Sequence, residues 1–318
     1  MIQAGIIGGG GYTAGELIRI LTYHPEVELA FVHSKSQAGN PIHSIHTDLL
    51  GEVNLDFTDT VDFGVDVIFL CMGHGQSKTF LESHEIPEEL VVIDLSHDYR
   101  LNPDFIYGLP EMNREEIRKS RRIANCGCFA TAIQLGLLPL AKAGLLQDEV
   151  HVTAITGSTG AGQSPGATTH FSWRNNNISV YKAFKHQHLA EILRSLTQLQ
   201  PDFTDKVNFI PVRGDFARGI FASIYTDCAL SGSELQALYE EYYQDAPFTI
   251  VTEQNPNVKQ VVNTNKCIVH VEEHDGKAFI ISTIDNLLKG ASGQAVENMN
   301  LVFGFPQTAG LQLKASVF

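Results

Sequence analysis

Residues 2–14 read IQAGIIGGGGYTA, and this stretch is the starting point for predicting the fold of the N-terminal half. The apolar run from Ile2 to Ile7 ends at four consecutive glycines, and residues 12–23 then follow with apolar side chains at helical spacing. Glycines between a strand and a helix let the backbone approach a pyrophosphate, whose charge the helix N-terminus favours. The stretch predicts a dinucleotide site formed by Gly8, Gly10, Gly11, Tyr12, Thr13 and Ala14. The alternative is an ordinary turn between a strand and a helix.

Strand and helix signals continue to alternate through the first half of the chain. Val27 to Val32, Val65 to Cys71 and Leu90 to Leu95 are apolar runs typical of buried strands. Alternation of this kind predicts a parallel sheet covered by helices on both faces, as in a Rossmann-type dinucleotide-binding domain.

The second half is richer in strands and predicts an α+β domain with a mixed sheet. Strands are expected at Val150 to Ile155, Val207 to Val212, Gly219 to Cys228, Cys267 to Glu272 and Ala278 to Ile284. Helices are expected from Phe129 to Ala143, with a kink or early stop at Pro139, from His188 to Leu199, after a capping box at Ser231 to Glu234, and from Ser292 to Phe303. We therefore predict a dinucleotide-binding domain at residues 1–127, joined by a C-terminal helical segment at 292–318. A catalytic, substrate and oligomerisation domain would span residues 128–291.

The end of the second predicted strand indicates which nicotinamide cofactor binds. NAD-binding folds usually place an acidic residue there for the ribose 2′-hydroxyl. This chain has His33 followed by Ser34, Lys35 and Ser36, whose hydroxyls and positive charge suit a 2′-phosphate. The sequence therefore favours NADP, unless Lys35 is simply a solvated loop charge.

Composition and charge exclude several classes of protein. The 318 residues include 22 basic and 36 acidic side chains, a net charge of −14 that argues against nucleic acid or an anionic membrane as the main partner. The five cysteines show neither a disulfide framework nor the spacing of a metal site. The N-terminus lacks the features of a signal peptide, and no apolar run approaches the ~18 residues of a membrane span. We expect a cytoplasmic protein that acts on a small molecule.

A cysteine near a predicted helix start is the candidate nucleophile. Residues 125–131 read NCGCFAT and lie between a short strand, Arg122 to Ala124, and an apolar helix. The amide groups at a helix N-terminus favour a thiolate and can hold a developing oxyanion, which points to Cys128. The alternative is a buried structural cysteine, which is the commoner role for a single cysteine.

Histidines and arginines supply partners for such a nucleophile. In HQHLAE, residues 186–191, His188 and Glu191 share one helix face, so the carboxylate can orient the imidazole as an acid–base group; His186 is the other candidate. Arg100 and Arg218 are candidate clamps for a substrate carboxylate or phosphate, although surface ion pairs would explain them equally well.

Taken together, these motifs resemble the N-acetyl-gamma-glutamyl-phosphate reductase family over nearly the full length. The resemblance rests on GGGGYTAGEL at 8–17, IDLS at 93–96 with Tyr99 and Arg100, YGLPE at 107–111, NCGCFAT at 125–131, GSTGAG at 157–162, HQHLAE at 186–191, RGI at 218–220 and NLLKGASGQA at 286–295. It implies a fold like that of glyceraldehyde-3-phosphate dehydrogenase and an NADPH-dependent reduction of an acyl phosphate through a thioester on Cys128, with release of phosphate. It also implies that Asn125 and Ser158 contact the substrate and that Gly160, Ala161, Gly162 and Asn286 contact the cofactor.

Three departures from the family pattern bear on function. Ala14 replaces a glycine, Cys126 replaces a proline, and residues 211–218, PVRGDFAR, place Arg213 and Asp215 where apolar residues are usual. Arg213 would reach solvent, pair with Asp215, or hold the carboxylate of an N-succinyl group in place of N-acetyl.

The sequence leaves two other functions open. One is an enzyme like aspartate-semialdehyde dehydrogenase, and the other is a catalytically silent NADP-binding regulatory subunit. We also expect a homo-oligomer, a dimer or a tetramer, between which the sequence does not decide.

Overall fold

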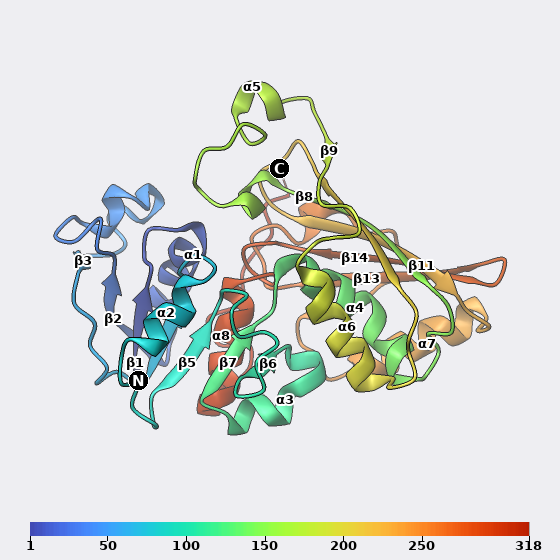
Figure 1. Cartoon of the computed structure of the whole chain (residues 1–318), viewed down its shortest axis with the longest axis horizontal. Coiled ribbons are helices and arrows are strands. Elements are labelled where there is room, and N and C mark those ends of the chain that lie inside the picture. Colours follow the sequence, from blue (N-terminus) through green and yellow to red (C-terminus); the bar gives the residue numbers. More distant parts are fainter. Residues whose placement is uncertain (318) are drawn as a thin grey trace. The chain divides into compact units, whose positions relative to one another are not determined.

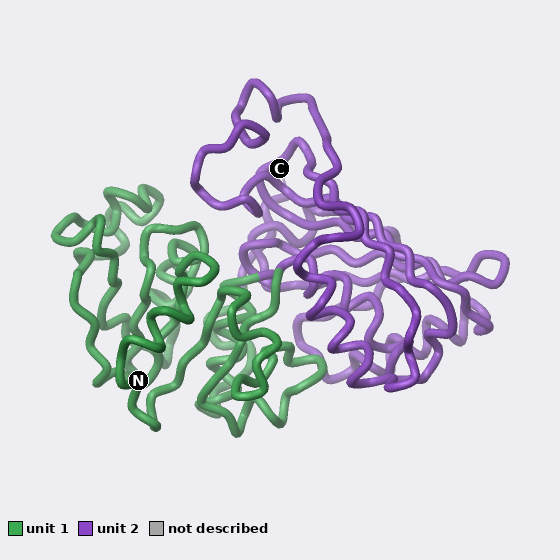
Figure 2. Tube along the Cα trace, viewed as in Figure 1, with its two compact units in different colours: residues 1–127, 291–312 green, residues 128–290, 313–318 purple. Residues whose placement is uncertain are grey.

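The computed structural model describes residues 1–317, which form two compact units (Figure 2). Unit 1 comprises residues 1–127 and 291–312, and unit 2 comprises residues 128–290 and 313–317. The chain passes from unit 1 to unit 2 between Gly127 and Cys128, and it re-enters unit 1 just before helix α8 (Ser292–Phe303).

Within the described residues, unit 1 contains one sheet of seven strands in the order β3-β2-β1-β4-β5-β7-β6, and all its paired neighbours are parallel. The strands are β1 (Ile2–Ile7), β2 (Val27–His33), β3 (Phe57–Thr58), β4 (Val67–Leu70), β5 (Val91–Asp94), β6 (Ile106–Gly108) and β7 (Arg122–Asn125). The order reverses next to β1, as in doubly wound dinucleotide-binding sheets. The parallel sheet and its first strands confirm the fold prediction.

The helices of unit 1 are α1 (Tyr12–Thr22), α2 (Gln76–Glu82), α3 (Pro110–Lys119) and α8. Phe80 of α2 packs against a buried cluster that includes Ile7, Ile68 and Val92. Helix α8 packs against α1 and α3 (Figure 1). Apolar side chains on both faces of the strands are thereby removed from water, which explains why these strands carry almost unbroken apolar runs.

Unit 2 builds a mixed sheet, of seven strands over the described residues, in the order β12-β13-β14-β11-β8-β10-β9. The strands are β8 (Val150–Thr156), β9 (Ser179–Val180), β10 (Val207–Arg213), β11 (Ile220–Asp227), β12 (Thr249–Val251), β13 (Cys267–His274) and β14 (Lys277–Ile284). The pairs β8–β10 and β12–β13 are parallel, and the others are antiparallel. This mixed sheet confirms the predicted α+β architecture.

Helices α4 (Cys128–Lys142), α6 (His188–Leu199) and α7 (Gly232–Tyr243) accompany this sheet, together with the short α5 (Phe171–Arg174). Burial alternates along β8 and β11, because one face of the sheet packs against α4 while side chains such as Thr153 and Tyr225 face away from it. The predicted capping box is confirmed: Glu234 N–H donates to Ser231 Oγ (3.4 Å), and Ser231 N–H donates to Glu234 Oε2 (2.9 Å).

Helix α4 continues through Pro139, so the predicted early stop is wrong. A proline cannot donate to the carbonyl four residues before it, which here is Leu135 O. The hydroxyl of Tyr243 donates to Leu135 O and that of Tyr239 donates to Gly136 O, each at 2.5 Å. The Tyr243 hydroxyl thus replaces the bond that Pro139 takes from Leu135 O, and the Tyr239 hydroxyl adds a donor to the next carbonyl.

The C-terminal segment departs from the predicted domain division. Helix α8 ends at Phe303, where Gly304 adopts a left-handed conformation (φ +70°). Residues 313–317 belong to unit 2, since Ser316 N–H donates to Val262 O and Asn263 Nδ2 donates to Lys314 O, both at 3.1 Å. Phe318, the last residue of the predicted segment, lies outside the described residues. None of the helices in residues 1–317 combines the length and the apolar composition needed to cross a bilayer.

Candidate active site

The glycine loop of unit 1 connects β1 to α1. Gly8 has φ +88°, and a Cβ added there would lie 2.9 Å from the Cys71 carbonyl carbon; one added at Gly9 would lie 2.3 Å from Val32 Cγ1. By contrast, a Cβ at Gly10 would meet only Ser34 Oγ at 4.0 Å, and one at Gly11 would meet no atom within 4 Å. Gly8 and Gly9 therefore allow the loop to pack on the sheet, while Gly10 and Gly11 border open space.

The start of α1 fits a bound phosphate. Gly11 is its N-cap residue and has no side-chain oxygen to accept from the first amides of the helix. Amides at a helix start together with the helix dipole form an anion site, so the loop suits the pyrophosphate of a dinucleotide. Tyr12 is exposed and the Thr13 carbonyl accepts from Ser292 Oγ (2.8 Å), whereas Ala14 is fully buried and packs in the core.

The residues predicted to choose between NADP and NAD lie beside this loop. Ser34 is largely buried next to Gly10, and Lys35 and Ser36 are exposed in the turn after β2. His33 precedes them, and burial lowers its pKa, as does the charge of Lys35. Asp59 opposes this shift, so a carboxylate that sequence reasoning missed also lies near His33.

In unit 2 the candidate nucleophile is the first residue of α4. Cys128 is partly exposed, whereas Cys126 is buried in unit 1 and its thiol donates to Gly108 O (3.3 Å). Gly290 packs against the nucleophile, because a Cβ added at Gly290 would lie 2.9 Å from Cys128 Cβ. The helix start at Cys128 agrees with the prediction, and the approach of Gly290 leaves no space for a larger residue.

Two buried histidines flank Phe129, the residue that follows the nucleophile. The ring centroids of His186 and His188 lie 5.4 and 6.3 Å from that of Phe129 and 4.5 Å from each other. The backbone N–H of His188 donates to His186 Nδ1 (3.2 Å), which puts the proton of neutral His186 on Nε2. Burial lowers the pKa of His186 to about 4, with Lys182 and Arg213 acting in the same direction. His186 is therefore a neutral imidazole at physiological pH.

His188 and Glu191 form the predicted pair on the first turn of α6. Their Nε2 and Oε1 atoms are 3.8 Å apart, and both side chains are buried. A carboxylate at this distance stabilises the protonated imidazole. The structure thus brings four predicted catalytic residues, Cys128, His186, His188 and Glu191, onto α4, α6 and the residues just before α6.

A fully buried carboxylate fixes Arg218. Asp285 Oδ2 accepts from Arg218 Nε (3.1 Å), lies 2.9 Å from its Nη2, and also accepts from Asn263 N–H (2.6 Å). Asp285 Oδ1 accepts from the backbone N–H groups of Leu287 (2.8 Å) and Leu288 (3.2 Å). The Arg218 side chain stays 21% exposed, so a guanidinium in a fixed orientation can still reach a ligand.

The predicted residues around Ser158 form a short helical turn, Ser158–Ala161. Gly160, Ala161 and Gly162 are exposed, and Ser158 N–H donates to Phe216 O (2.8 Å). Asn286 is buried and supports this turn: its Nδ2 donates to Thr159 Oγ1 (3.0 Å) and its Oδ1 accepts from Gly219 N–H (2.7 Å).

Arg213 is 9% exposed, and its guanidinium lies over the ring of Tyr181, 4.7 Å from the centroid. Asp215, the partner that the sequence offers, instead accepts from Asn176 N–H (2.7 Å). Burial raises the pKa of Tyr181 to about 12, and the proximity of Cys128 adds to this shift. Arg213 and Tyr181 therefore lie in the neighbourhood of the nucleophile, and the pairing of Arg213 with Asp215, one of the three alternatives that the sequence left open, is absent among the described contacts.

In unit 1, Arg100 and Asn125 are both buried and bonded to the protein. Arg100 donates from Nε to Asn125 O (2.9 Å) and from Nη2 to Leu95 O (3.2 Å). Asn125 Nδ2 donates to Ala291 O (2.9 Å), and its Oδ1 accepts from Asn298 (3.1 Å). These contacts brace the end of β7, three residues before Cys128.

Sequence reasoning missed Arg174, Tyr181, Asp285 and Gly290. Arg174 is buried and bonds mainly to main-chain carbonyls, for which a sequence gives no signal. Asp285 follows a predicted strand, so an acidic residue at a strand end was the one available signal. Among the side chains of residues 1–317, no group of three or more His, Cys, Asp or Glu is placed to hold a metal ion.

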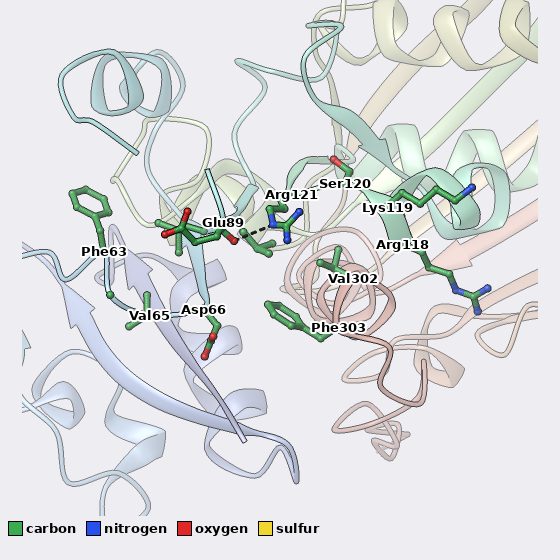
Figure 3. Close-up of a pocket in the computed structure, with 13 residues that line it drawn as sticks. Phe63, Val65, Asp66, Glu89, Arg118, Lys119, Ser120, Arg121, Val302 and Phe303 are labelled. Atoms are coloured by element: carbon green, nitrogen blue, oxygen red, sulfur yellow. Dashed lines mark hydrogen bonds between the residues drawn. The ribbon is translucent and has the colours of Figure 1, made fainter. Parts of the chain in front are cut away.

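A cavity of about 450 Å³ in unit 1, with the lining shown in Figure 3, lies at the amino ends of β4, β5 and β7, whereas the glycine loop follows the carboxyl end of β1. Asp66, Glu89 and Arg121 immediately precede or adjoin the starts of β4, β5 and β7, and Phe303 at the end of α8 completes the lining shown. Arg121 Nε donates to Glu89 O (3.2 Å). Ligands of such sheets bind at the carboxyl ends of the strands, so this cavity is not the cofactor site.

Comparison with solved structures shows the fold. Aspartate semialdehyde dehydrogenase II from Vibrio cholerae, complexed with ASA, is 17% identical with a TM-score of 0.74, covering 96% of this chain and 98% of its own. The enzyme from Candida albicans with NADP is 15% identical, with a TM-score of 0.73 and 96% and 99% coverage.

Family models and curated relatives give the class and then the family. Residues 3–120 match the NAD-binding domain of semialdehyde dehydrogenases and residues 128–286 match their dimerisation domain, so the chain has the domains of a semialdehyde dehydrogenase that binds a nicotinamide cofactor. The N-acetyl-gamma-glutamyl-phosphate reductases of Parabacteroides distasonis and Bacteroides fragilis are 58% and 59% identical, each match covering 100% of both chains. The chain belongs to the N-acetyl-gamma-glutamyl-phosphate reductase family.

Proposed function

We propose that this chain reduces an N-acyl-gamma-glutamyl phosphate to the N-acylglutamate 5-semialdehyde, with NADPH as reductant, in arginine biosynthesis. The observation that carries the proposal is the placement of Cys128 at the start of α4, with His186 and the His188–Glu191 pair flanking the adjacent Phe129. This is the set of groups that acyl transfer to a thiol and its reversal require.

The first step forms the thioester. The Cys128 thiolate attacks the carbonyl carbon of the acyl phosphate, a carbon–sulfur bond forms, and phosphate leaves with the bonding electrons. Amides at the start of α4 hold the oxyanion of this addition. Because its pKa is lowered to about 4, His186 is neutral, and its remaining proton is on Nε2. That N–H offers a further donor to the same oxygen.

The second step releases the aldehyde. A nicotinamide cofactor, when bound, would supply the hydride that reduces the thioester carbon. His188, as the imidazolium, protonates the resulting oxyanion to give the thiohemiacetal hydroxyl, and it takes that proton back as the carbon–sulfur bond breaks and the Cys128 thiolate is restored. Glu191 stabilises the imidazolium that His188 becomes, at the Nε2–Oε1 separation of 3.8 Å.

Two arginines are proposed to hold the substrate's anionic groups. Arg218, oriented by Asp285, binds a carboxylate or phosphate on its exposed edge. Arg213 is nearly buried and its described contacts are with Tyr181 rather than with a carboxylate, so it favours an anionic ligand in the acyl part of the site. That arrangement supports an N-succinyl group over N-acetyl. Ser158 is proposed to contact the substrate, whereas Arg100 and Asn125 position the end of β7.

NADP is the proposed cofactor. Gly10, Gly11 and the start of α1 would hold the pyrophosphate, and Ser34, Lys35 and Ser36 the 2′-phosphate. Gly160, Ala161, Gly162 and Asn286 are proposed to make the other contacts with the cofactor. The match to a dimerisation domain supports a homo-oligomer, and the biosynthetic role supports a cytoplasmic location.

The deciding experiment runs the reaction in its oxidative direction. Purified protein is given NADP, phosphate and either N-acetyl- or N-succinylglutamate semialdehyde, and NADPH formation is followed by absorbance. We expect phosphate-dependent turnover that Cys128→Ser abolishes, with nucleotide binding retained, while the matched Cys126→Ser variant keeps most activity. Turnover with aspartate semialdehyde alone would overturn the proposal in favour of the aspartate-type enzyme. Nucleotide binding with no turnover on any of the three substrates would favour a silent regulatory subunit.

A further inference from the structure

A buried histidine contacts the backbone of the glycine loop in unit 1. His46 is 6% exposed, and its Nε2 lies 2.7 Å from the carbonyl oxygen of Gly9. A carbonyl oxygen can only accept a hydrogen bond, so the imidazole carries a proton on Nε2 and donates it to Gly9 O. The glycine loop is therefore held by a side chain that lies 37 residues further along the chain.

The segment that carries His46 connects β2 to β3 (Figure 1). Two short 3₁₀ turns, Ile42–Ser44 and Thr47–Leu49, flank the histidine, and the side chains of Ile42 and Leu49 are buried. The His46 N–H donates to Ile42 O, and the Leu49 N–H donates to His46 O, both at 3.0 Å. Because it is anchored on both sides, the imidazole has a fixed position.

The ring of His46 also packs against helix α1. A Cβ added at Gly15, near the start of this helix, would lie 2.6 Å from His46 Nδ1, well inside contact distance. Glycine within a helix is less favourable than alanine, so Gly15 is explained by the imidazole that occupies the space of a side chain. One imidazole thereby joins the glycine loop to the helix that follows it.

This contact fixes the direction of the peptide group between Gly9 and Gly10. The Gly9 N–H donates to His33 O (2.9 Å) and its carbonyl accepts from His46, so the residue is held at both ends. The peptide group is planar and trans, so the Gly10 N–H points away from His46. No hydrogen bond within residues 1–317 uses that N–H, and Gly10 borders open space. The Gly10 amide is therefore an oriented donor beside the start of α1.

We propose that His46 is a positioning residue of the dinucleotide site: by holding the Gly9 carbonyl, it directs the Gly10 N–H toward the pyrophosphate of the bound cofactor. Main-chain amides bind phosphate oxygens well, and a loop that is ordered in advance loses less entropy on binding. His46 itself does not contact the cofactor, because its ring is buried and its Nε2 proton is used by Gly9 O. The inference rests on the proposed function in one respect, the assignment of the glycine loop to the pyrophosphate.

Substitutions at His46 separate the hydrogen bond from the packing of the ring. In His46→Gln the amide nitrogen takes the place of Nε2 and can donate to Gly9 O, whereas in His46→Asn it takes the place of Nδ1. We expect His46→Asn and His46→Ala to raise the dissociation constant of NADP by roughly 10- to 100-fold, the effect of losing one hydrogen bond to a charged group. His46→Gln should bind NADP within about threefold of wild type, because the donor is retained.

Dissociation constants are measured by calorimetry on the protein without substrate, so the readout does not need turnover. The same loss is expected for NAD, because the two cofactors share the pyrophosphate. Adenosine 2′-monophosphate carries the 2′-phosphate but no pyrophosphate, and its dissociation constant should not change. The control variant is His43→Ala, which removes a half-buried histidine of the same segment whose side chain makes no hydrogen bond within residues 1–317. It should bind all three nucleotides as wild type does.

Gly15→Ala tests the same contact from the side of the helix. Its Cβ must displace the imidazole, so NADP binding should weaken as it does in His46→Ala, although alanine favours the helix. In the His46→Ala background the space is empty. There, Gly15→Ala should leave the dissociation constant unchanged and raise the urea midpoint of the nucleotide-free protein. This reversal of sign distinguishes positioning by the imidazole from a general loss of packing.

An unchanged NADP dissociation constant in His46→Ala, or equal values for the Gln and Asn variants, would overturn the positioning role. An equal loss of affinity for adenosine 2′-monophosphate would overturn it too, because that ligand does not reach the pyrophosphate contact. Urea denaturation of each variant shows whether it is folded, and the Gln and Asn variants decide the matter if His46→Ala is not. If wild-type protein binds NADP but turns over neither N-acyl substrate, the proposed function fails, whereas the binding comparison still decides the role of His46.

Discussion

Replacing Asp285 with asparagine tests whether this buried carboxylate positions Arg218. Asparagine has the same shape but only one acceptor oxygen. If that oxygen keeps the bonds to Leu287 and Leu288, its NH₂ group faces Arg218 and Asn263 N–H, which are donors now held at 2.6–3.1 Å. Donor would then face donor inside the protein.

The size of the effect follows from these contacts. A buried donor left without an acceptor costs about 1–3 kcal/mol of stability. The Arg218 side chain is 21% exposed, so water can reach it and the cost for its donor lies at the lower end of this range. We therefore expect Asp285→Asn to lower the free energy of unfolding by about 2–4 kcal/mol. An Arg218 that is no longer oriented should raise KM for the acyl substrate by roughly 10- to 100-fold, equivalent to about 1.4–2.7 kcal/mol.

Urea denaturation and steady-state kinetics measure the two effects separately. If Asp285 had only a structural role, Asp285→Asn would lower stability without a selective rise in KM. A double-mutant cycle that combines Asp285→Asn with Arg218→Met distinguishes the two roles. If Asp285 acts through Arg218, the second substitution adds little to KM once the first is made. Additive effects on KM, or a KM for Asp285→Asn within twofold of wild type, would refute the positioning role.

Three further predictions address the cofactor, the acyl group and pH. Wild type should show a higher kcat/KM with NADP than with NAD, and Lys35→Ala should lower that ratio about tenfold, the effect of about 1.4 kcal/mol; equal values for the two cofactors in wild type would contradict the 2′-phosphate site. Arg213→Ala should lower kcat/KM for the N-succinyl substrate by about 100-fold and for the N-acetyl substrate much less, since losing one partner of a desolvated ion pair costs about 2–5 kcal/mol; equal losses would make Arg213 structural. Because the folded-state pKa of His186 is lowered to about 4, from 6.5, the unfolded chain binds the extra proton and stability falls as pH drops from 6.5 to 4. His186→Gln should remove about 3 kcal/mol of that acid dependence in urea titrations at several pH values, and an unchanged slope would show that His186 titrates normally.

The sequence predicted best those features that depend on local pattern. Helix α6 begins and ends where predicted because its apolar side chains recur at helical spacing. Helix α7 begins at a reciprocal pair of hydrogen bonds between Ser231 and Glu234, which the sequence pattern predicted. The helix start at Cys128 was likewise readable from an apolar run that follows a strand.

The remainder depends on contacts between residues far apart in the chain. Arg174 has no periodic neighbours, and its acceptors come from positions 168, 177, 179 and 213. Strand β9 is two residues long and exists only because β10 lies beside it. The sequence singled out Arg213, but whether its side chain would meet Asp215 or Tyr181 depended on how residues 163–187 fold back beside β10, which no local pattern encodes.

The proline within α4 has a consequence for how unit 2 folds. The carbonyls of Leu135 and Gly136 receive hydroxyl donors from Tyr243 and Tyr239, more than a hundred residues later in the chain. A nascent chain that has emerged only as far as β8 therefore still lacks the two hydroxyls that bond to these carbonyls. Closing so long a loop is slow, and it ties helix formation to tertiary docking. We expect the helix that carries the nucleophile to become fully ordered late, only once α7 has been synthesised and docked against it.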